Sequence, residues 1–318
     1  MWILLNAKNL INFASFSLNI LLKKIQTENK MIVLKNISKY YKSKAAVKDI
    51  NLEFEPGVIY GLLGRNGAGK TTLINIITNR IFATKGQVFV DGENATENDS
   101  AQSKIFCMTD KNSYPGDLKV KDGLKWIKGF YENFDLDYAK RLCGIFGLDV
   151  KKRTKALSTG YNSIFKLILT LASGAEIMIF DEPVLGLDAN FRDVFYKELL
   201  SRFAELKNTM IISTHLIEEI SAVLGRVVII DNGKIILNTS SAELKEYAYV
   251  ISGDKEKVEK FIKNRNIIHK ETLGSYLVAT IKNKATDEDL KEIKSLKLDL
   301  SAPKLQELFI NLTNKENC

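Results

Sequence analysis

The chain has 318 residues, of which 45 % are hydrophobic and 26 % are charged. This composition excludes a disordered or low-complexity protein, and the length suggests about two domains. The formal charge of +8 is spread along the chain and predicts no nucleic-acid partner. The three cysteines form no CxxC pair, which argues against a zinc ribbon or a disulfide scaffold and is typical of a reducing cytosol.

Residues 1–30 are apolar but interrupted by asparagine, serine and lysine. They are too polar for a membrane-spanning helix, and they lack the basic start and the cleavage site of a signal peptide. Two interpretations stay open. The segment is either an extension upstream of a true start at Met31 or an amphipathic helix at a membrane interface.

From residue 31 the sequence predicts alternating strands and helices. Strands are expected over residues 32–34, 51–55, 58–63, 87–90, 177–180 and 210–213. Helices are expected over 70–79, 117–150 and 164–172, and between the last two strands. Asn232-Gly233 predicts a hairpin between strands at 227–230 and 234–237. This alternation indicates a mostly parallel sheet with helices on both faces.

The segment from Gly64 to Thr71 matches the pattern GxxxxGK[ST] in full, between a buried strand and a helix. Its glycines let successive backbone N–H groups point at phosphate oxygens, and the helix N-terminus adds a partial positive charge. A chance glycine-rich turn is the alternative, and the strand-loop-helix context disfavours it. The predicted nucleotide-binding residues of this loop are Gly64, Arg65, Asn66, Gly67, Ala68, Gly69, Lys70, Thr71 and Thr72.

Within the loop, Lys70 is the expected contact of the β- and γ-phosphates, and Thr71 offers its hydroxyl to Mg²⁺. Two acids, Asp181 and Glu182, follow the apolar strand at 177–180, at the strand end where open parallel sheets bind ligands. Asp181 is predicted to hold Mg²⁺ and Glu182 to polarise the attacking water as a general base. The alternative is an ordinary acidic pair after a strand.

His215 ends the next strand, which should lie beside the strand that carries Asp181. This placement predicts a position near the γ-phosphate and a catalytic role beside Lys70 and Glu182. Taken alone, a histidine at a strand end is more often a hydrogen-bonded structural residue.

Together these motifs resemble the nucleotide-binding domain of an ABC transporter over about residues 32–237. The resemblance implies an α/β P-loop NTPase core of the ABC type, with an antiparallel β subdomain and a helical subdomain at about 117–172. It places the ATP-binding domain at 31–239 and a small α+β accessory segment at 240–318. It also implies ATP and Mg²⁺ as cofactors and ATP hydrolysis as the reaction.

The resemblance assigns further residues to the nucleotide. Tyr41 corresponds to an aromatic that stacks on adenine, although Tyr40 is a rival. Leu157–Tyr161 corresponds to the signature motif, and Asp188 belongs to the D-loop. In that family two domains close head to tail, so Ser158 and the Gly160 amide would contact the γ-phosphate held by a partner chain.

Two departures from the family pattern concern the signature and the Q-loop. Thr159 and Tyr161 replace a glycine and a glutamine of the signature, and Asp110 stands near the position of the Q-loop glutamine. Asp110 is the third predicted metal ligand, after Thr71 and Asp181. These departures resemble ATPases tied to antibiotic- or peptide-responsive exporters of low-GC Gram-positive bacteria, such as the YtrB-like group.

The predicted function is an ATP-hydrolysing subunit of an exporter for peptide or antibiotic-like compounds. The subunit would lie on the cytoplasmic face of the cell membrane and drive a separate integral membrane permease by ATP-dependent dimer closure. A homodimer and a heterodimer with another ABC ATPase both stay open. The alternatives are a soluble ABC ATPase without a transporter and a regulatory pseudo-ATPase. Asp110 and Thr159 keep the pseudo-ATPase open, whereas Lys70 and Glu182 argue against it.

Overall fold

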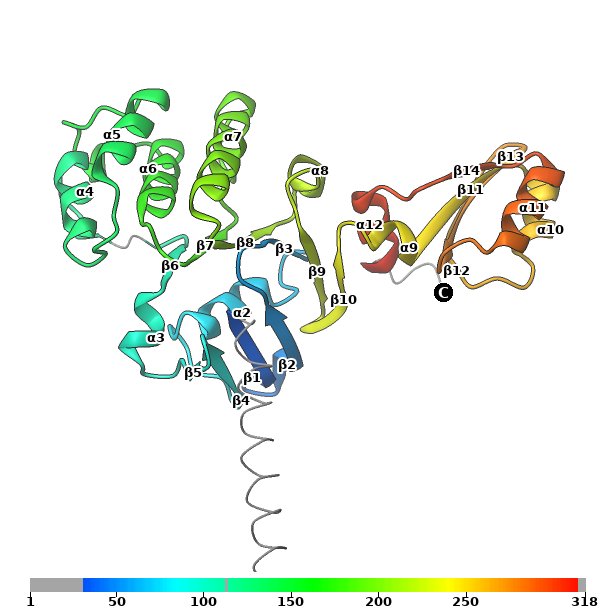
Figure 1. The fold of residues 1–318 in the computed structure, drawn as a ribbon, viewed down its shortest axis with the longest axis horizontal. Helices are drawn as coiled ribbons and strands as arrows, with labels where there is room; N and C mark the ends of the chain where they lie inside the picture. Colours follow the sequence, from blue (N-terminus) through cyan, green and yellow to red (C-terminus); the bar gives the residue numbers. More distant parts are fainter. Residues whose placement is uncertain (1–30, 112–113, 314–318) are drawn as a thin grey trace, which may run out of the picture.

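The computed structural model describes residues 31–111 and 114–313, so both interpretations of residues 1–30 lie outside the described residues. The described strands form three sheets, and the helices cover them in layers (Figure 1). No helix in the described part of the chain combines the length and the apolar character that crossing a bilayer requires.

The central sheet has six strands. In spatial order they are β10 (Lys234–Ser240), β9 (Arg226–Asp231), β3 (Ile59–Leu63), β8 (Thr209–Thr214), β7 (Ile177–Asp181) and β6 (Ile105–Met108). All pairs are parallel except the β9–β10 hairpin. β3 and β8 are buried along their whole length, as expected for strands covered on both faces.

One face of the central sheet is covered by an antiparallel sheet and two short helices. The sheet order is β2 (Lys44–Phe54), β1 (Ile32–Tyr41), β4 (Lys85–Val90) and β5 (Glu93–Asn94). The helices are α2 (Lys70–Ile77) and α3 (Asp99–Ser103). Apolar side chains of α2, β1 and β2 meet those of the central strands in one hydrophobic cluster, which fixes the start of α2 above the end of β3.

Helices cover the opposite face. They are α4 (Val120–Lys128), α5 (Leu136–Ile145), α6 (Thr159–Ala172), α7 (Ala189–Leu206) and α8 (Ile217–Ile220), with a 3₁₀ turn at Thr154–Ala156. The continuous helical stretch expected over 117–150 is instead two helices, because Gly129 ends α4 and the Asp135 carboxylate caps α5 by accepting from Tyr138 N. Likewise α6 begins five residues before the predicted start, because Ser158 caps it.

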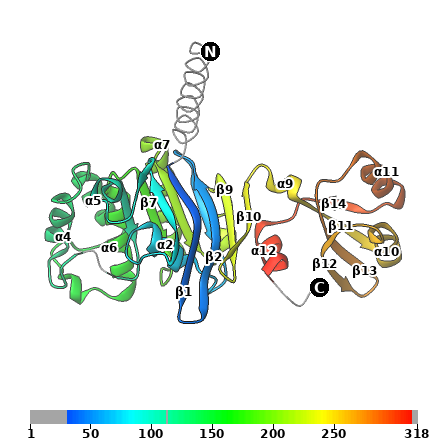
Figure 2. The same ribbon diagram turned by 90° about the horizontal axis from the view of Figure 1, so that it is seen from below.

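The remaining elements follow β10. They are α9 (Leu244–Tyr247), β11 (Ala248–Asp254), α10 (Lys255–Ile262), β12 (Ile267–Leu273), β13 (Tyr276–Lys282), α11 (Asp287–Leu296), β14 (Asp299–Ser301) and α12 (Leu305–Thr313). Their antiparallel sheet has the order β12-β13-β11-β14. Figures 1 and 2 show α9 and α12 between this sheet and the rest of the chain. The boundary predicted at residue 240 stays a prediction, since α12 packs on the core of the preceding residues.

Candidate functional site

The loop between β3 and α2 has the backbone conformation that its glycines allow. Gly67 has φ +80° and Gly69 has φ +114°, both in the region that L-residues avoid. A Cβ on Gly69 would lie 2.7 Å from the Ala46 carbonyl oxygen. Lys70 opens α2, is 5 % exposed, and donates from Nζ to the Gly64 carbonyl oxygen at 2.7 Å. The chain therefore forms a narrow cradle with one buried cation.

Glu182 lies against this cation. Its Oε1 is 3.2 Å from Lys70 Nζ and is buried without a well-angled hydrogen bond, while its Oε2 is 2.9 Å from His215 Nδ1. The contact with His215 arises because β7 and β8 are parallel neighbours in register, with Asp181 beside Ser213. The three predicted catalytic residues, Lys70, Glu182 and His215, thus meet at one point.

Glu182 also carries backbone strain. Its φ is +50°, and its N–H donates to the Ser213 carbonyl oxygen at 2.9 Å. A non-glycine residue in this conformation costs about 1–2 kcal/mol. Such strain often occurs at functional sites, where the surrounding structure holds a side chain in a required position.

Asp181, the residue before Glu182, lies deeper. It accepts from Ser213 Oγ at 2.8 Å and is hydrogen-bonded by the Thr71 hydroxyl. Burial raises the pKa of Asp181, and the Ser213 and Thr71 hydrogen bonds oppose that increase. Two of the three predicted metal ligands, Thr71 and Asp181, are therefore side by side.

A cavity of about 590 Å³ opens above the cradle. Of the predicted residues, it is lined by Tyr41, Arg65, Asn66, Gly67, Gly69, Lys70, Thr71, Thr72 and Glu182. Gly64 and Ala68 belong to the same loop but do not line the cavity, because each is packed against neighbouring residues on the protein side. Tyr41 is at the rim, 51 % exposed. A volume of this size is within the range of small-molecule and cofactor sites.

Five lining residues were not predicted: Lys44, Ala45, Ala46, Asn232 and Gly233. They come from the start of β2 and from the β9–β10 turn. Lys48 N of β2 donates to the Gly233 carbonyl oxygen of the turn, and Gly233 N donates to the Ala68 carbonyl oxygen of the phosphate loop. The Asn-Gly turn was recognised as a hairpin, but nothing local in its sequence indicates which loop it contacts.

Ser158, Gly160 and Asp188 do not line the cavity. Ser158 and Asp188 instead cap α6 and α7, accepting from Tyr161 N and Phe191 N. A Cβ on Gly160 would lie 3.4 Å from the Gly186 carbonyl oxygen, so the signature and D-loop positions are neighbours. Within one chain, these residues form a second surface, separate from the phosphate cradle.

Asp110 is not brought to the cavity either. Its carboxylate accepts from the adjacent Lys111 N at 2.9 Å. Its backbone is hydrogen-bonded by Lys166 of α6, a lysine that is only 8 % exposed. Lys166 Nζ donates to the Thr109 carbonyl oxygen at 3.1 Å and also to that of Asp110. Burial lowers the pKa of Lys166, and the Asp110 carboxylate opposes that decrease.

Replacing Lys166 with methionine is expected to release residues 109–111. The substitution keeps the buried stem but leaves two carbonyl groups without a donor, at a cost of about 1–3 kcal/mol. We expect a lower melting temperature and faster tryptic cleavage after the exposed Lys111, measured by calorimetry and timed digestion. Lys197→Met, at an exposed position of α7, is the matched control. Unchanged cleavage in Lys166→Met would show that this contact does not hold the segment.

The residues present fit a nucleotide and Mg²⁺. The buried Glu182 Oε1 has an ion pair with Lys70 but no hydrogen-bond partner, and the loop carries glycine at position 69, where a Cβ would collide with the Ala46 carbonyl oxygen. Among described residues there is no group of three or more His, Cys, Asp or Glu side chains that could hold a metal. A cation here would therefore depend on Thr71, Asp181, phosphate oxygens and water, which suits Mg²⁺ because it retains several waters.

Comparisons with known proteins agree with this geometry. A family model described as "ABC transporter" matches residues 47–185. The chain is 28 % identical over 285 residues to the ABC transporter ATP-binding protein YtrB of Bacillus subtilis (strain 168), covering 88 % of this chain and 97 % of that protein. It is 30 % identical over 217 residues to the bacitracin transport ATP-binding protein BcrA of Bacillus licheniformis, covering 66 % and 70 %.

Among solved structures, the dimeric structure of MJ0796, a bacterial ABC transporter cassette, superposes with a TM-score of 0.60 at 22 % identity. The match covers 66 % of this chain and 99 % of that one. The chain belongs to the ABC transporter ATP-binding proteins, an ATPase family. The resemblance and the fold class predicted from the motifs are thereby confirmed.

Proposed function

We propose that this chain is the ATP-hydrolysing subunit of an exporter for peptide or antibiotic-like compounds. In this proposal it lies on the inner face of the cell membrane and drives a separate integral membrane permease. The cargo class is supported by the likeness to BcrA, whose name refers to bacitracin transport. The observation that carries the catalytic part is that Glu182, which lines the cavity with Lys70, contacts Lys70 through one carboxylate oxygen and His215 through the other.

The roles of these residues follow from their contacts. Lys70, buried and fixed to Gly64, supplies the cation for the β- and γ-phosphates, and the loop amides supply hydrogen bonds to them. Glu182, when freed from Lys70, is the base that takes a proton from the attacking water. His215 orients this carboxylate through Nδ1. Mg²⁺ held by Thr71 and Asp181 would neutralise phosphate charge.

Dimerisation is supported by two predicted nucleotide contacts, Ser158 and Gly160, that do not line the cavity of their own chain. Both residues lie at the N-terminus of α6, where backbone N–H groups favour an anion. We infer that they contact the nucleotide bound to a second chain, either a copy of this one or another ABC ATPase. The dimeric form of the MJ0796 cassette supports such a pairing.

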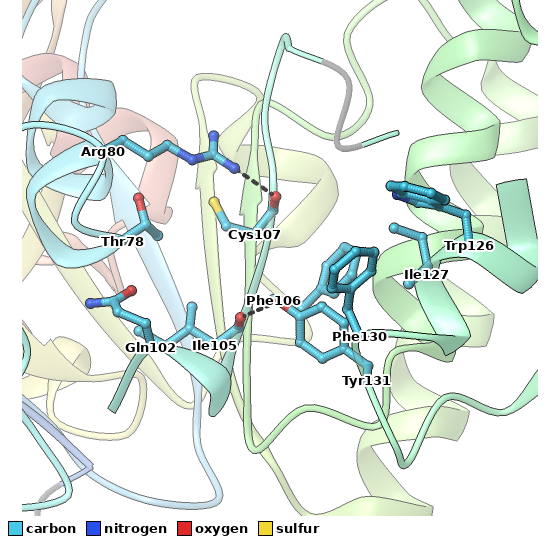
Figure 3. Close-up of a pocket in the computed structure, with 10 residues that line it drawn as sticks. All are labelled: Thr78, Arg80, Gln102, Ile105, Phe106, Cys107, Trp126, Ile127, Phe130 and Tyr131. Carbon is cyan, nitrogen blue, oxygen red and sulfur yellow. Dashed lines mark hydrogen bonds between the residues drawn. The ribbon is translucent and has the colours of Figure 1, made fainter. Parts of the chain in front are cut away.

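A second cavity supplies the surface for the permease. It has about 410 Å³ and lies between β6, the end of α2 and α4 (Figure 3). Trp126 of α4 and Phe130, which follows the end of that helix, border the cavity and are 43 % and 67 % exposed, with ring centroids 5.3 Å apart. Exposed aromatic pairs beside a concave surface are typical of protein–protein contacts.

The walls of this second cavity connect it to the catalytic site. Tyr131 donates to the Ile105 carbonyl oxygen, and Arg80 donates to the Cys107 carbonyl oxygen (Figure 3). Arg80 also donates to the Thr109 hydroxyl. Residues 105–109 lead to the segment held by Lys166, and β6 is the parallel neighbour of the strand that ends at Asp181. Movement of a permease segment in this cavity would therefore reach the catalytic carboxylates through one strand pair.

Co-purification from detergent extracts of the source cells tests this proposal. An integral membrane protein is expected to accompany the full chain, and Trp126→Ser with Phe130→Ser should lose it while retaining ATP hydrolysis. Leu200→Ser, which removes an exposed apolar side chain on α7, should retain the partner. Recovery of ribosomes instead of a membrane protein would contradict the transporter assignment.

A further inference from the structure

The C-terminal sheet has two faces with different contacts. On one face, alternate residues such as Ile251 and Ala279 pack with α10 and α11 in a separate hydrophobic cluster. On the other face, Val250, Val278 and Thr280 border a cavity of about 420 Å³, and α12 forms its opposite wall. The cavity therefore lies between this sheet and a single helix and is open to solvent on one side.

The lining of this cavity combines carboxylates with aliphatic surface. Glu271 of β12 and Glu307 of α12 contribute the carboxylates, and the other polar lining residues are His269, Thr280 and Asn311. Lys304 Nζ is 3.9 Å from Glu307 Oε1. Both of those side chains are exposed, so this ion pair contributes little, and the two carboxylates outnumber the one imidazole in the lining.

The same helix has a second face, which packs on the ATPase core. Leu305, Leu308 and Phe309 of α12 are buried in the hydrophobic cluster that contains Ile217 and Ile220 of α8. The cavity-lining residues of α12 are Glu307, Ile310 and Asn311, at positions adjacent in sequence to these buried ones. Anything that moves α12 against the sheet must therefore also change its packing on α8.

α8 is directly connected to the catalytic histidine. It begins at Ile217, two residues after His215, and the intervening turn is held by a hydrogen bond from Leu216 N to Thr214 Oγ1 at 3.0 Å. Ile217 and Ile220 are 1 % and 0 % exposed, so α8 has little room to move independently of its neighbours. A shift in α12 would consequently change the position of the His215 ring relative to Glu182.

We propose that the cavity between the C-terminal sheet and α12 binds a small organic cation with a short aliphatic body. Occupancy is coupled through α12 and α8 to His215, and so sets the rate of ATP hydrolysis. The two carboxylates select the positive charge, and Val250, Val278 and Ile310 contact the aliphatic part. The site is separate from the nucleotide cavity, so its occupant acts as an effector rather than as a substrate.

Charged thiol reagents test both parts of this proposal in the full chain. Ile310→Cys, on a Cys318→Ser background, places a thiol in the cavity at a position that is 40 % exposed. Cys107 and Cys143 are buried, and burial raises their pKa to about 12 and about 11, so neither competes at neutral pH. Methanethiosulfonates bearing trimethylammonium or sulfonate groups then serve as cationic and anionic probes.

The cationic reagent is expected to label Ile310→Cys about 5-fold faster or more than the anionic one at low ionic strength. The difference should disappear in about 1 M salt, where the Debye length is about 3 Å, and in the added double variant Glu271→Gln, Glu307→Gln. Protein labelled with the cation should change its kcat for ATP hydrolysis about 5-fold or more. Asn311→Cys repeats the test if Ile310→Cys fails to fold.

Leu200→Cys provides the matched control, because Leu200 is 41 % exposed on α7, away from the cavity. Its labelling rates should not depend on reagent charge, and its kcat should not change. Equal rates for both reagents at Ile310→Cys would overturn the cation site, and an unchanged kcat after labelling would overturn the coupling. Absence of ATP hydrolysis in unlabelled protein would count against the proposed function, while the labelling ratio would still test the cavity.

Discussion

Replacing Glu182 with glutamine is expected to lower kcat for ATP hydrolysis about 100- to 1,000-fold. A positioned general base contributes factors of this size, and an amide accepts no proton from the attacking water. Glutamine keeps the length of the side chain, so the strained backbone at φ +50° and the contact with His215 Nδ1 are retained. Steady-state phosphate release measures the loss.

The same substitution should strengthen ATP binding. In the structure the Glu182 carboxylate is the ion-pair partner of Lys70 at 3.2 Å, so it competes with phosphate for this buried ammonium group. A neutral amide ends this competition. We therefore expect Glu182→Gln to accumulate an ATP-bound dimer, detected by size-exclusion chromatography. Adding Ser158→Arg should remove that dimer, because Ser158 lies on the surface assigned to the partner's nucleotide.

Glu176→Gln is the matched control for Glu182→Gln. Glu176 precedes β7, the strand that Glu182 follows, and it is exposed at the opposite edge of the sheet. The Glu176→Gln variant should therefore hydrolyse ATP at the wild-type rate. Hydrolysis by Glu182→Gln at that rate would remove Glu182 from the role of base.

Replacing Lys70 with methionine is expected to weaken ATP binding at least about 10-fold. The ammonium is 5 % exposed, and its hydrogen bond to Gly64 aims it into the cavity. Hydrogen bonds to charged groups contribute about 1.5–3 kcal/mol, which corresponds to roughly 10- to 150-fold in affinity. Methionine retains most of the aliphatic stem, so the hydrophobic contacts of α2 should persist. Titration calorimetry with ATP measures the change. Both proteins carry Glu182→Gln, so that ATP is bound but not hydrolysed, and they differ only at Lys70.

Lys85→Met, at an exposed position on β4, controls for the loss of one positive charge and should bind ATP normally. An unchanged melting temperature in Lys70→Met would show that the lost affinity is not unfolding. ATP binding by Lys70→Met with wild-type affinity would contradict the assignment of the phosphate cradle.

Local sequence patterns were enough to predict the conformation of the loop before Lys70 and the adjacency of the two strands that end near Asp181 and His215. The glycine spacing before Lys70 allows one backbone conformation between a strand and a helix, so the cradle could be predicted from eight consecutive residues. The apolar runs before Asp181 and His215 indicated buried parallel strands, and parallel neighbours end at the same edge of a sheet. The register of β7 and β8 confirms that adjacency.

Other features could not be read from local patterns. The four-residue strand β6 was missed because a short apolar run without turn signals does not distinguish a strand from a buried helix segment. The contacts of Asp110 were also not predictable, because they depend on Lys166, 56 residues later on another element. A buried lysine in a helix has no sequence signature that names its partner.

The sequence by itself determined the family and predicted the residues of the candidate nucleotide site, because both depend on residue types at fixed spacing along a few short segments. Only the tertiary structure decided which loops complete the cavity, that the signature residues lie outside it, and that α12 joins the C-terminal sheet to α8. These features depend on the packing of segments far apart in the chain. Such packing is selected by burial of many weakly specific apolar side chains, and no short motif encodes it.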